Sequence, residues 1–217
     1  MKIISVDYGK HLGVAVYDEN LVKPVGVFNE EEFFSFLHGL DFDFLILGIP
    51  YNLKGEFSKK TFETVDFGIK LKKMLKNRRI YLVDERFTTL YGKKISGMKE
   101  KKYRKFKDVI SAMEILNSYL SSPHLAHEID EGKFVRLDEE IYERMKERKI
   151  LVDRVLLDPE DERLKSLDLI FLTDDPYHFY SLKKRRFIVY FRKTADEIDI
   201  AYDLILKYKN GVLSLCP

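Results

Sequence analysis

The chain has 217 residues, of which 45% are hydrophobic and 34% are charged, a balance typical of a globular protein with one large domain or two small ones. No apolar run approaches the roughly 20 residues that a membrane span needs, and the amino terminus has no apolar signal core, so we expect a cytoplasmic protein that does not contact a membrane. The single cysteine, Cys216, excludes a disulfide framework and a cysteine-based metal site.

The net charge of +2 is unevenly distributed along the chain. Residues 1–124 hold 21 lysines and arginines against 16 acidic residues, whereas the remainder holds 17 against 20. The first part of the chain is therefore the better candidate for binding a polyanion such as a nucleic acid.

Three strands are predicted close together at the start of the chain, over residues 3–7, 12–17 and 22–28. The connections between them are too short for a parallel crossover, so the three strands should form an antiparallel meander. Pro24 lacks an N–H to donate, and we therefore expect the third strand at an edge of the sheet.

Helices and strands then alternate. Asn29 and Glu32 form a capping signature that predicts a helix to about residue 40. Further elements are predicted as strands over 44–47 and 79–83, a helix after Ser58, a helical stretch after Thr88 or Thr89, and a long helix over 103–120. This order predicts an α/β domain over residues 1–122, with a mixed five-stranded sheet and flanking helices.

The periodicity breaks after residue 122, and we expect a connector over 123–137. Residues 138–217 are predicted to form a smaller C-terminal α/β domain. Its expected elements are a helix over 138–149, strands over 151–157, 169–172 and 187–191, a helix opened by Thr194 and Glu197, and a final strand after the turn at Asn210 and Gly211. No motif in this second domain indicates a function.

Four acidic residues stand where an acid is unusual. Asp7 follows the first strand, Asp84 and Glu85 follow the strand over 79–83, and Asp108 lies on the apolar stripe of the long helix. Each alone could start a turn, favour a helix terminus or face solvent. If the strands are neighbours and the helix covers them, however, the carboxylates converge and repel one another, and a divalent cation such as Mg²⁺ would offset the repulsion. The sequence thus predicts metal-assisted phosphate chemistry.

A basic segment precedes Asp108 directly. Residues 93–107 carry many lysines and arginines interleaved with aromatic residues, as in segments that bind nucleic-acid backbones and unpaired bases. The loop after the strand over 44–47 lies where ligands of open α/β sheets bind. The candidate nucleic-acid contacts in these two segments are Lys101, Lys102, Arg104 and Lys105, and Asn52 and Lys54.

Several motifs in this order resemble those of the YqgF/RuvX family. They are Asp7-Tyr8-Gly9, Gly13-Val14-Ala15-Val16, Leu47-Gly48-Ile49-Pro50 with Asn52 and Gly55, Asp84-Glu85-Arg86-Phe87-Thr88-Thr89, and Lys105, Asp108, Ala112 and Ile115-Leu116. The resemblance covers residues 1 to about 122. It implies an RNase H-like fold and a nuclease, since members are described as Holliday junction resolvases and as nucleases that trim the 5′ end of precursor 16S rRNA.

The resemblance also implies roles for individual residues. Asp7, Glu85 and Asp108 match the catalytic acids and would bind Mg²⁺ or Mn²⁺, with Asp84 as an additional ligand. Arg86 would orient its loop or contact phosphate. Lys10 is a further candidate phosphate contact, although the turn between Gly9 and Gly13 is one residue shorter than the family pattern.

Three functions follow as alternatives. We favour a metal-dependent nuclease that processes the 5′ end of precursor 16S rRNA, because RNA recognition relies on unpaired bases, stacking and shape. The second is a Holliday junction resolvase, which would act on branched DNA as a homodimer. The third is a nucleic-acid or ribosome-associated binding protein without catalysis, which would show salt-sensitive binding but no metal-dependent turnover.

Overall fold

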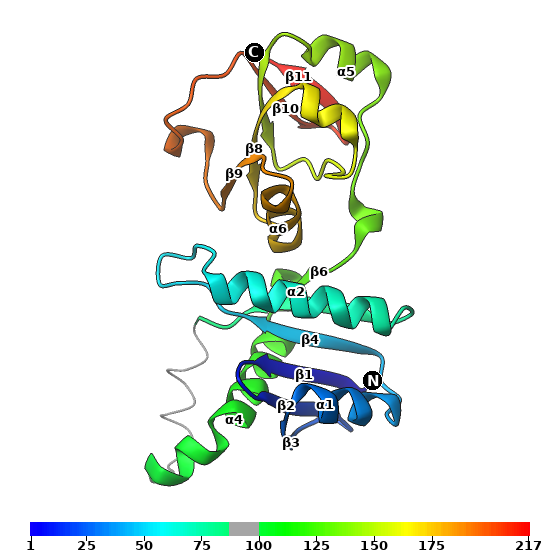
Figure 1. Ribbon diagram of the computed structural model, residues 1–217, viewed down its shortest axis with the longest axis vertical. Coiled ribbons are helices and arrows are strands. Elements are labelled where there is room, and N and C mark those ends of the chain that lie inside the picture. Colours follow the sequence, from blue (N-terminus) through cyan, green and yellow to red (C-terminus); the bar gives the residue numbers. More distant parts are fainter. Residues whose placement is uncertain (87–99) are drawn as a thin grey trace. The chain divides into compact units, whose positions relative to one another are not determined.

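A computed structural model of the protein describes residues 1–86 and 100–217, and side chains from residue 106 onward in the second range. The chain forms two compact units, Met1–Ile129 and Asp130–Pro217, and each is described by itself (Figure 1). The expected connector over 123–137 is divided between them, and the helical stretch expected after Thr88 or Thr89 lies outside the described residues. No helix in the described ranges combines the length and apolar character needed to cross a membrane.

The first unit contains the predicted mixed sheet, with strand order β3-β2-β1-β4-β5-β6. The strands are β1 (Ile3–Tyr8), β2 (Leu12–Asp18), β3 (Leu21–Phe28), β4 (Phe44–Ile49), β5 (Arg79–Asp84) and β6 (His127–Glu128). The first three are antiparallel, whereas β1, β4 and β5 are parallel. This is the RNase H-like arrangement that the sequence predicts, with Pro24 on the edge strand β3. The two-residue β6, antiparallel to β5, adds a sixth strand to the five expected.

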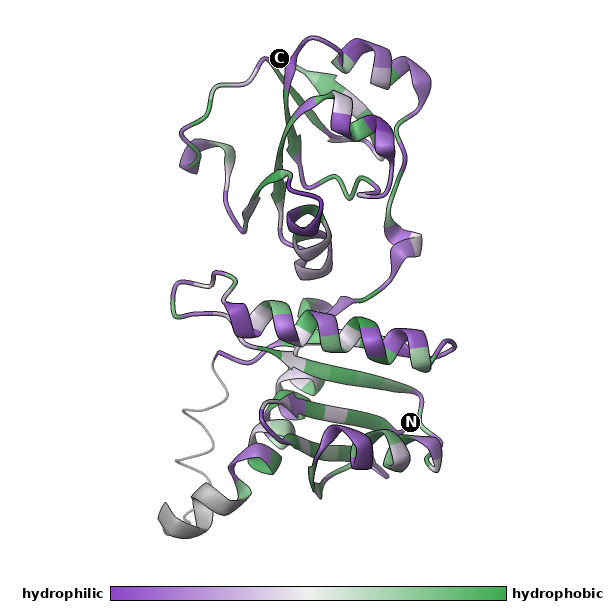
Figure 2. Cartoon of the chain, viewed as in Figure 1, coloured by the Kyte–Doolittle hydropathy of each residue, from purple (hydrophilic) through white to green (hydrophobic). Residues whose placement is uncertain are grey.

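Helices cover both faces of this sheet. They are α1 (Glu30–His38), α2 (Lys59–Met74) and α4 (Glu100–Ser121). Side chains of a strand alternate between faces, and Ile3 and Ile46 pack with Ile115 of α4. Tyr8, of opposite parity, stacks on Phe67 of α2 at 4.4 Å between ring centroids. Figure 2 shows the resulting pattern, in which β1 and β4 are hydrophobic and the helices carry the hydrophilic surface.

Capping residues define the starts of α1 and α2. Asn29 and Glu32 form the predicted capping box of α1, with both hydrogen bonds at 2.9 Å. Ser58 caps α2 as expected. The buried Thr61 hydroxyl in the first turn of α2 donates to the carbonyl of Pro50. The start of α2 is therefore attached to the carboxyl end of β4.

The second unit is the predicted smaller α/β domain, with strand order β11-β10-β7-β8-β9. Its elements are α5 (Glu139–Met145), β7 (Lys149–Asp153), β8 (Asp168–Thr173), α6 (Pro176–Lys184), β9 (Ile188–Phe191), β10 (Leu204–Lys209) and β11 (Val212–Cys216). Short 3-10 turns occupy Pro123–Leu125, Glu131–Lys133, Glu162–Ser166 and Ala195–Glu197. Four strands are parallel, and β11 pairs antiparallel with β10 across the expected turn at Asn210 and Gly211.

One expectation for this unit is wrong. The helix expected after Thr194 is a single 3-10 turn followed by extended chain, because Ile198, Ile200 and Tyr202 alternate with the exposed Asp199 and Ala201 and pack against one face of the sheet. The N–H of Asp203 then donates to the carbonyl of Lys149 at 2.7 Å, which begins the pairing of β10 with β7.

Two other elements of this unit end earlier than expected. The strand expected over 151–157 ends at Asp153, and α5 ends at Met145 instead of residue 149. Helix α6 was not expected: Asp175 caps it by accepting from the N–H of His178 at 2.8 Å, and Pro176 occupies its first position.

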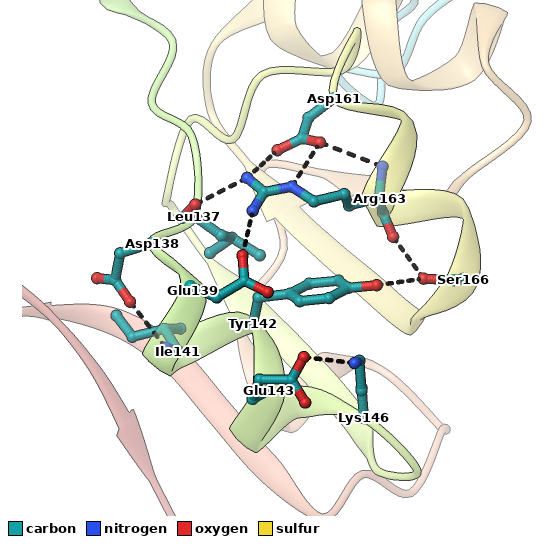
Figure 3. Close-up of polar contacts among 10 residues, drawn as sticks. All are labelled: Leu137, Asp138, Glu139, Ile141, Tyr142, Glu143, Lys146, Asp161, Arg163 and Ser166. Atoms are coloured by element: carbon teal, nitrogen blue, oxygen red, sulfur yellow. Dashed lines mark hydrogen bonds and ion pairs between the residues drawn. The ribbon is translucent and has the colours of Figure 1, made fainter.

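An arginine fastens α5 to the chain between β7 and β8 (Figure 3). The Arg163 guanidinium donates to Asp161 at 2.7 Å, to the Leu137 carbonyl at 2.8 Å and to Glu139 at 3.3 Å. It lies over the ring of Tyr142, 5.3 Å from the ring centroid. The hydrogen bonds from Arg163 hold the pKa of Asp161 below its usual value. The charged pair therefore stabilises the attachment of α5.

Candidate active site

Asp7 and Glu85 lie on one face of the first sheet, beneath α4. Asp7 follows Ile3 and Ser5 in the alternation of β1, and Glu85 follows Val83, whose side chain belongs to the cluster beneath α4. The Glu85 N–H donates to the carbonyl of Ile49 at 3.3 Å, so the pairing of β4 and β5 continues one residue beyond the strand. The parallel strands β1 and β5, on either side of β4, thus bring the two carboxylates to the same edge.

Both carboxylates are costly to ionise in this position. Burial, with a further contribution from the charge of Asp7, raises the pKa of Glu85 to about 7. Burial also raises the pKa of Asp7, and the charge of Asp108 adds to the effect. Ser111 of α4 forms a hydrogen bond with the Asp7 carboxylate that partly offsets this rise. Burial is therefore the main reason that both carboxylates resist ionisation, and the neighbouring acidic charges add to it.

Glu85 occupies space that a glycine leaves open. A Cβ atom on Gly48 of β4 would lie 2.8 Å from Glu85 Oε2 and 2.3 Å from Ile115 Cδ1. The missing side chain lets the glutamate extend across β4 toward Asp7.

Asp108 adjoins Asp7 from α4. The third predicted acid is half-buried, and its charge acts on Asp7. Among the side chains that the structure describes, however, no three acidic, histidine or cysteine side chains gather closely enough to surround a metal ion. The arrangement is therefore a coupled pair, Asp7 and Glu85, with Asp108 beside Asp7.

Two lysines act on this pair: Lys60, which the sequence analysis did not name, and Lys107, the last residue of the predicted basic segment. The positive charges of Lys60 in the first turn of α2 and Lys107 of α4 lower the pKa values of Asp7 and Glu85. One sequence signal could have drawn attention to Lys60: the first turn of α2 contains no acidic residue and two lysines, against the preference of the helix dipole.

Asp84 points to the other side of the strand from Glu85. Its carboxylate accepts from Arg86 Nη2 at 2.8 Å and from Arg86 Nε at 3.1 Å, and the Arg86 N–H also donates to it. The guanidinium lies 5.5 Å from the centroid of the Tyr51 ring. Asp84 thus orients Arg86, which lines the pocket described below.

The remaining predicted contacts lie around this centre or outside the described side chains. Asn52 Oδ1 accepts from the N–H groups of Lys54 and Glu56, both at 2.9 Å, so Asn52 shapes the loop after β4. Lys10 and Lys54 are exposed. The predicted contacts whose side chains the structure does not describe are Lys101, Lys102, Arg104 and Lys105.

A pocket of about 260 Å³ opens over the acid pair. It is lined by Asp7, Pro50, Tyr51, Leu53, Lys60, Glu85, Arg86, Lys107 and Ser111. Carboxylates form part of its wall, and three cationic side chains stand around them. Such a pocket suits a phosphate group, which the cations would attract. The carboxylate oxygens fit a hard divalent cation such as Mg²⁺, which would relieve their repulsion.

Comparisons with known proteins converge on the first unit. The family model described as "RuvX: Holliday junction resolvase" matches residues 1–122. A relative from Thermotoga maritima is 28% identical over 131 residues, which cover 60% of this chain and 55% of that protein, so the match spans about half of the relative's length. A relative from Sulfurihydrogenibium is 32% identical over 142 residues, covering 58% of this chain and 94% of its own. Both carry the name "Putative pre-16S rRNA nuclease".

Two solved structures each match a little over half of this chain. Thermus thermophilus RuvC is 10% identical, with a TM-score of 0.38, and the match covers 59% of this chain and 100% of RuvC. The same protein in complex with a Holliday junction substrate is 12% identical, also with a TM-score of 0.38, covering 59% of this chain and 99% of that one.

Proposed function

Since the chain belongs to the RuvX family of Holliday junction resolvases, we propose that it is a divalent-metal-dependent nuclease with its centre at Asp7, Glu85 and Asp108. One observation carries the proposal: Asp7 and Glu85 form a half-buried, mutually repelling pair in the wall of a pocket that also holds Lys60 and Lys107. An acid pair with raised pKa values in such a pocket is a typical functional-site signature.

The residues of the pocket would have different roles in the reaction. Asp7 and Glu85 would hold Mg²⁺ or Mn²⁺, with Asp108 completing the acidic set. When bound, such an ion activates water and stabilises the leaving oxygen of a phosphodiester. Ser111 orients the Asp7 carboxylate by its hydrogen bond. Lys60, Lys107 and Arg86 attract and position the phosphate, and Lys10 and Lys54 provide further exposed cations near the loops.

We propose precursor 16S rRNA as the substrate, cleaved at its 5′ end in the cytoplasm. The relatives from Thermotoga and Sulfurihydrogenibium support this substrate through the name they share. The basic segment before Asp108 fits an RNA strand with unpaired bases.

The second candidate is resolution of a four-way DNA junction. It is supported by the description of the matching family. Such a reaction needs two cuts, and hence two copies of the site in a homodimer. A measurement of mass in solution at the concentration used for cleavage separates the candidates, since a monomer that cleaves rRNA does not fit junction resolution.

The proposal is tested by cleavage of both substrates. We would compare the wild type with Asp7→Asn and Glu85→Gln on a 5′-extended 16S rRNA fragment and on a four-way junction, each with Mg²⁺, Mn²⁺ or EDTA. Removing a group that acts in the reaction should lower the rate at least about 100-fold. Equal metal-dependent cleavage by all three proteins would refute the site, and salt-sensitive binding without any cleavage by the wild type would favour the non-catalytic alternative.

A further inference from the structure

A run of cations lies in the second unit, outside the segment that matches the family. Residues 183–193 contain six lysines and arginines and no acidic residue, although the chain beyond residue 124 holds more acidic than basic side chains. These cations are Lys183, Lys184, Arg185, Arg186, Arg192 and Lys193. They occupy the end of α6, two of the three residues that connect it to β9, and the two residues after β9, which is an edge strand of its sheet.

Aromatic rings between α6 and β9 hold three of these cations in place. Arg192 lies 4.9 Å from the centroid of Phe191, and Lys183 lies 5.7 Å from the centroid of Phe179. The two rings are themselves in contact, with centroids 5.3 Å apart. Lys184 lies 5.1 Å from the centroid of Tyr180. Lys183 and Arg192 thus lie over one pair of contacting rings and Lys184 lies over a separate ring, and stacking limits the conformations that a ligand would have to select.

Two arginines of the run stand where the backbone favours glycine. Arg186 has φ 67° directly after α6, and the Arg186 and Phe187 N–H groups donate to the Lys183 and Leu182 carbonyls in the pattern that usually has glycine at this position. Arg192 has φ 54°, and its N–H donates to the Thr173 carbonyl at 3.0 Å. Glycine can therefore replace either arginine without straining the backbone.

We propose that this surface, formed by Lys183, Lys184, Arg186 and Arg192, binds the phosphate backbone of a nucleic-acid strand. Arg185 and Lys193 of the same run form ion pairs with Glu160 and Glu162 and with Glu197. The rings of Phe179 and Tyr180 beneath the two lysines are buried, so they position charges and do not stack bases. The surface therefore recognises phosphates without regard to sequence. It would give the proposed nuclease a second contact with its substrate, and in naming nucleic acid as the ligand the inference rests on that proposed function.

The backbone strain offers variants that remove charge without endangering the fold. Arg186→Gly and Arg192→Gly each remove a cation and place glycine where φ is positive, so the thermal midpoint should stay the same or rise. The matched control is Arg144→Gln with Lys146→Gln, which removes two exposed cations at the end of α5, drawn at the other end of this unit (Figure 1).

Binding is measured with the full-length chain in EDTA, on a background of Asp7→Asn, so that cleavage cannot interfere. The probes are fluorescently labelled single strands of RNA and of DNA with one sequence, followed by anisotropy between 50 and 300 mM salt. The double glycine variant should bind about tenfold more weakly, and the salt slope should fall by about 1.4 because two phosphate contacts are lost. The α5 control should bind like its parent.

The outcomes are decisive for the surface and independent of catalysis. A loss with either strand supports the surface and identifies the nucleic acid that it prefers. Unchanged affinity and slope in the double glycine variant overturn the inference, as does competition by polyglutamate that equals competition by RNA. The binding assay contains no metal and does not depend on cleavage. If the wild type cleaves no substrate in the separate cleavage assay, the proposed nuclease is refuted and the binding result still stands.

Discussion

Gly13 of β2 lies directly against the backbone of Asp108 in α4: a Cβ atom on Gly13 would be 2.0 Å from the Asp108 carbonyl oxygen and 2.2 Å from its carbonyl carbon. Backbone atoms inside a packed helix cannot move aside as the end of a side chain can. The absence of a side chain at residue 13 therefore sets how closely α4 approaches the sheet, and with it the position of Asp108 beside Asp7.

The first prediction is that Gly13→Ala disturbs both the fold and the site. Overpacking should lower the free energy of unfolding by about 3 kcal/mol, and cleavage should be largely lost even at temperatures where the protein stays folded. Gly9→Ala is the control, because Gly9 is exposed and a Cβ there would lie 3.4 Å from the nearest atom, the His11 carbonyl oxygen. Chemical denaturation and cleavage assays measure both effects. Equal stability of the two variants would show that α4 is not held by this contact.

Much of this site follows from the alternation of side chains in strands. Asp7 shares the parity of Ile3, and Glu85 shares that of Val83, so a helix covering those apolar residues must also cover the two acids. Which of Asp84 and Glu85 faces the site depends on where β5 ends, and the local sequence does not determine that end. The two therefore remained joint candidates until their faces were known.

Other features depend on contacts that local patterns do not reveal. Lys60 reaches the acids only because Thr61 attaches the start of α2 to Pro50 at the end of β4. In the second unit, the capping pair Thr194 and Glu197 does form, with the Thr194 N–H donating to Glu197 at 2.7 Å. A helix does not follow, because the chain must run extended to cover the sheet before β10 begins.

The second prediction concerns stability and pH in the absence of metal. The pKa of Glu85 is about 7 in the folded protein and near 4.5 when the residue is unfolded. Below pH 4.5 both states are protonated. Between pH 4.5 and 7 only the unfolded state ionises, so the free energy of unfolding falls as pH rises, by up to about 3 kcal/mol in total. Above pH 7 the loss is complete.

Glu85→Gln should abolish this contribution, because glutamine does not ionise. In EDTA the variant should be as stable as the wild type near pH 4.5 and more stable at pH 8, by a margin that urea denaturation can resolve. Added Mg²⁺ should restore stability at pH 8 to the wild type and not to the variant. Parallel stability curves for the two proteins across this range would argue against an ionised, uncompensated Glu85.

The third prediction separates two adjacent lysines. Lys60 acts on Asp7 and Glu85, whereas the side chain of Lys59 is 92% exposed and pairs with Glu63 at 3.6 Å. Lys60→Gln should slow cleavage about tenfold or more, because a cation that positions the phosphate is lost. Lys59→Gln removes the same charge one residue away and should leave the rate within about twofold. Equal rates for the two variants would mean that only the overall charge of the helix start matters.

The last prediction asks whether Asp84 binds metal or orients Arg86. Its carboxylate is engaged by the Arg86 guanidinium and N–H, and both side chains are about three-quarters buried, with exposed fractions of 23% and 22%. Asp84→Asn should therefore cost about 2 kcal/mol of stability, through the weakened charge-assisted hydrogen bonds. The stabilisation that Mg²⁺ gives the wild type should persist, because Asp7 and Glu85 are intact, and cleavage should fall much less than in Glu85→Gln. Thermal shifts with and without Mg²⁺ measure the difference. An Mg²⁺ response abolished as completely as in Glu85→Gln would instead make Asp84 a ligand, and would require its carboxylate to leave Arg86 when the ion binds.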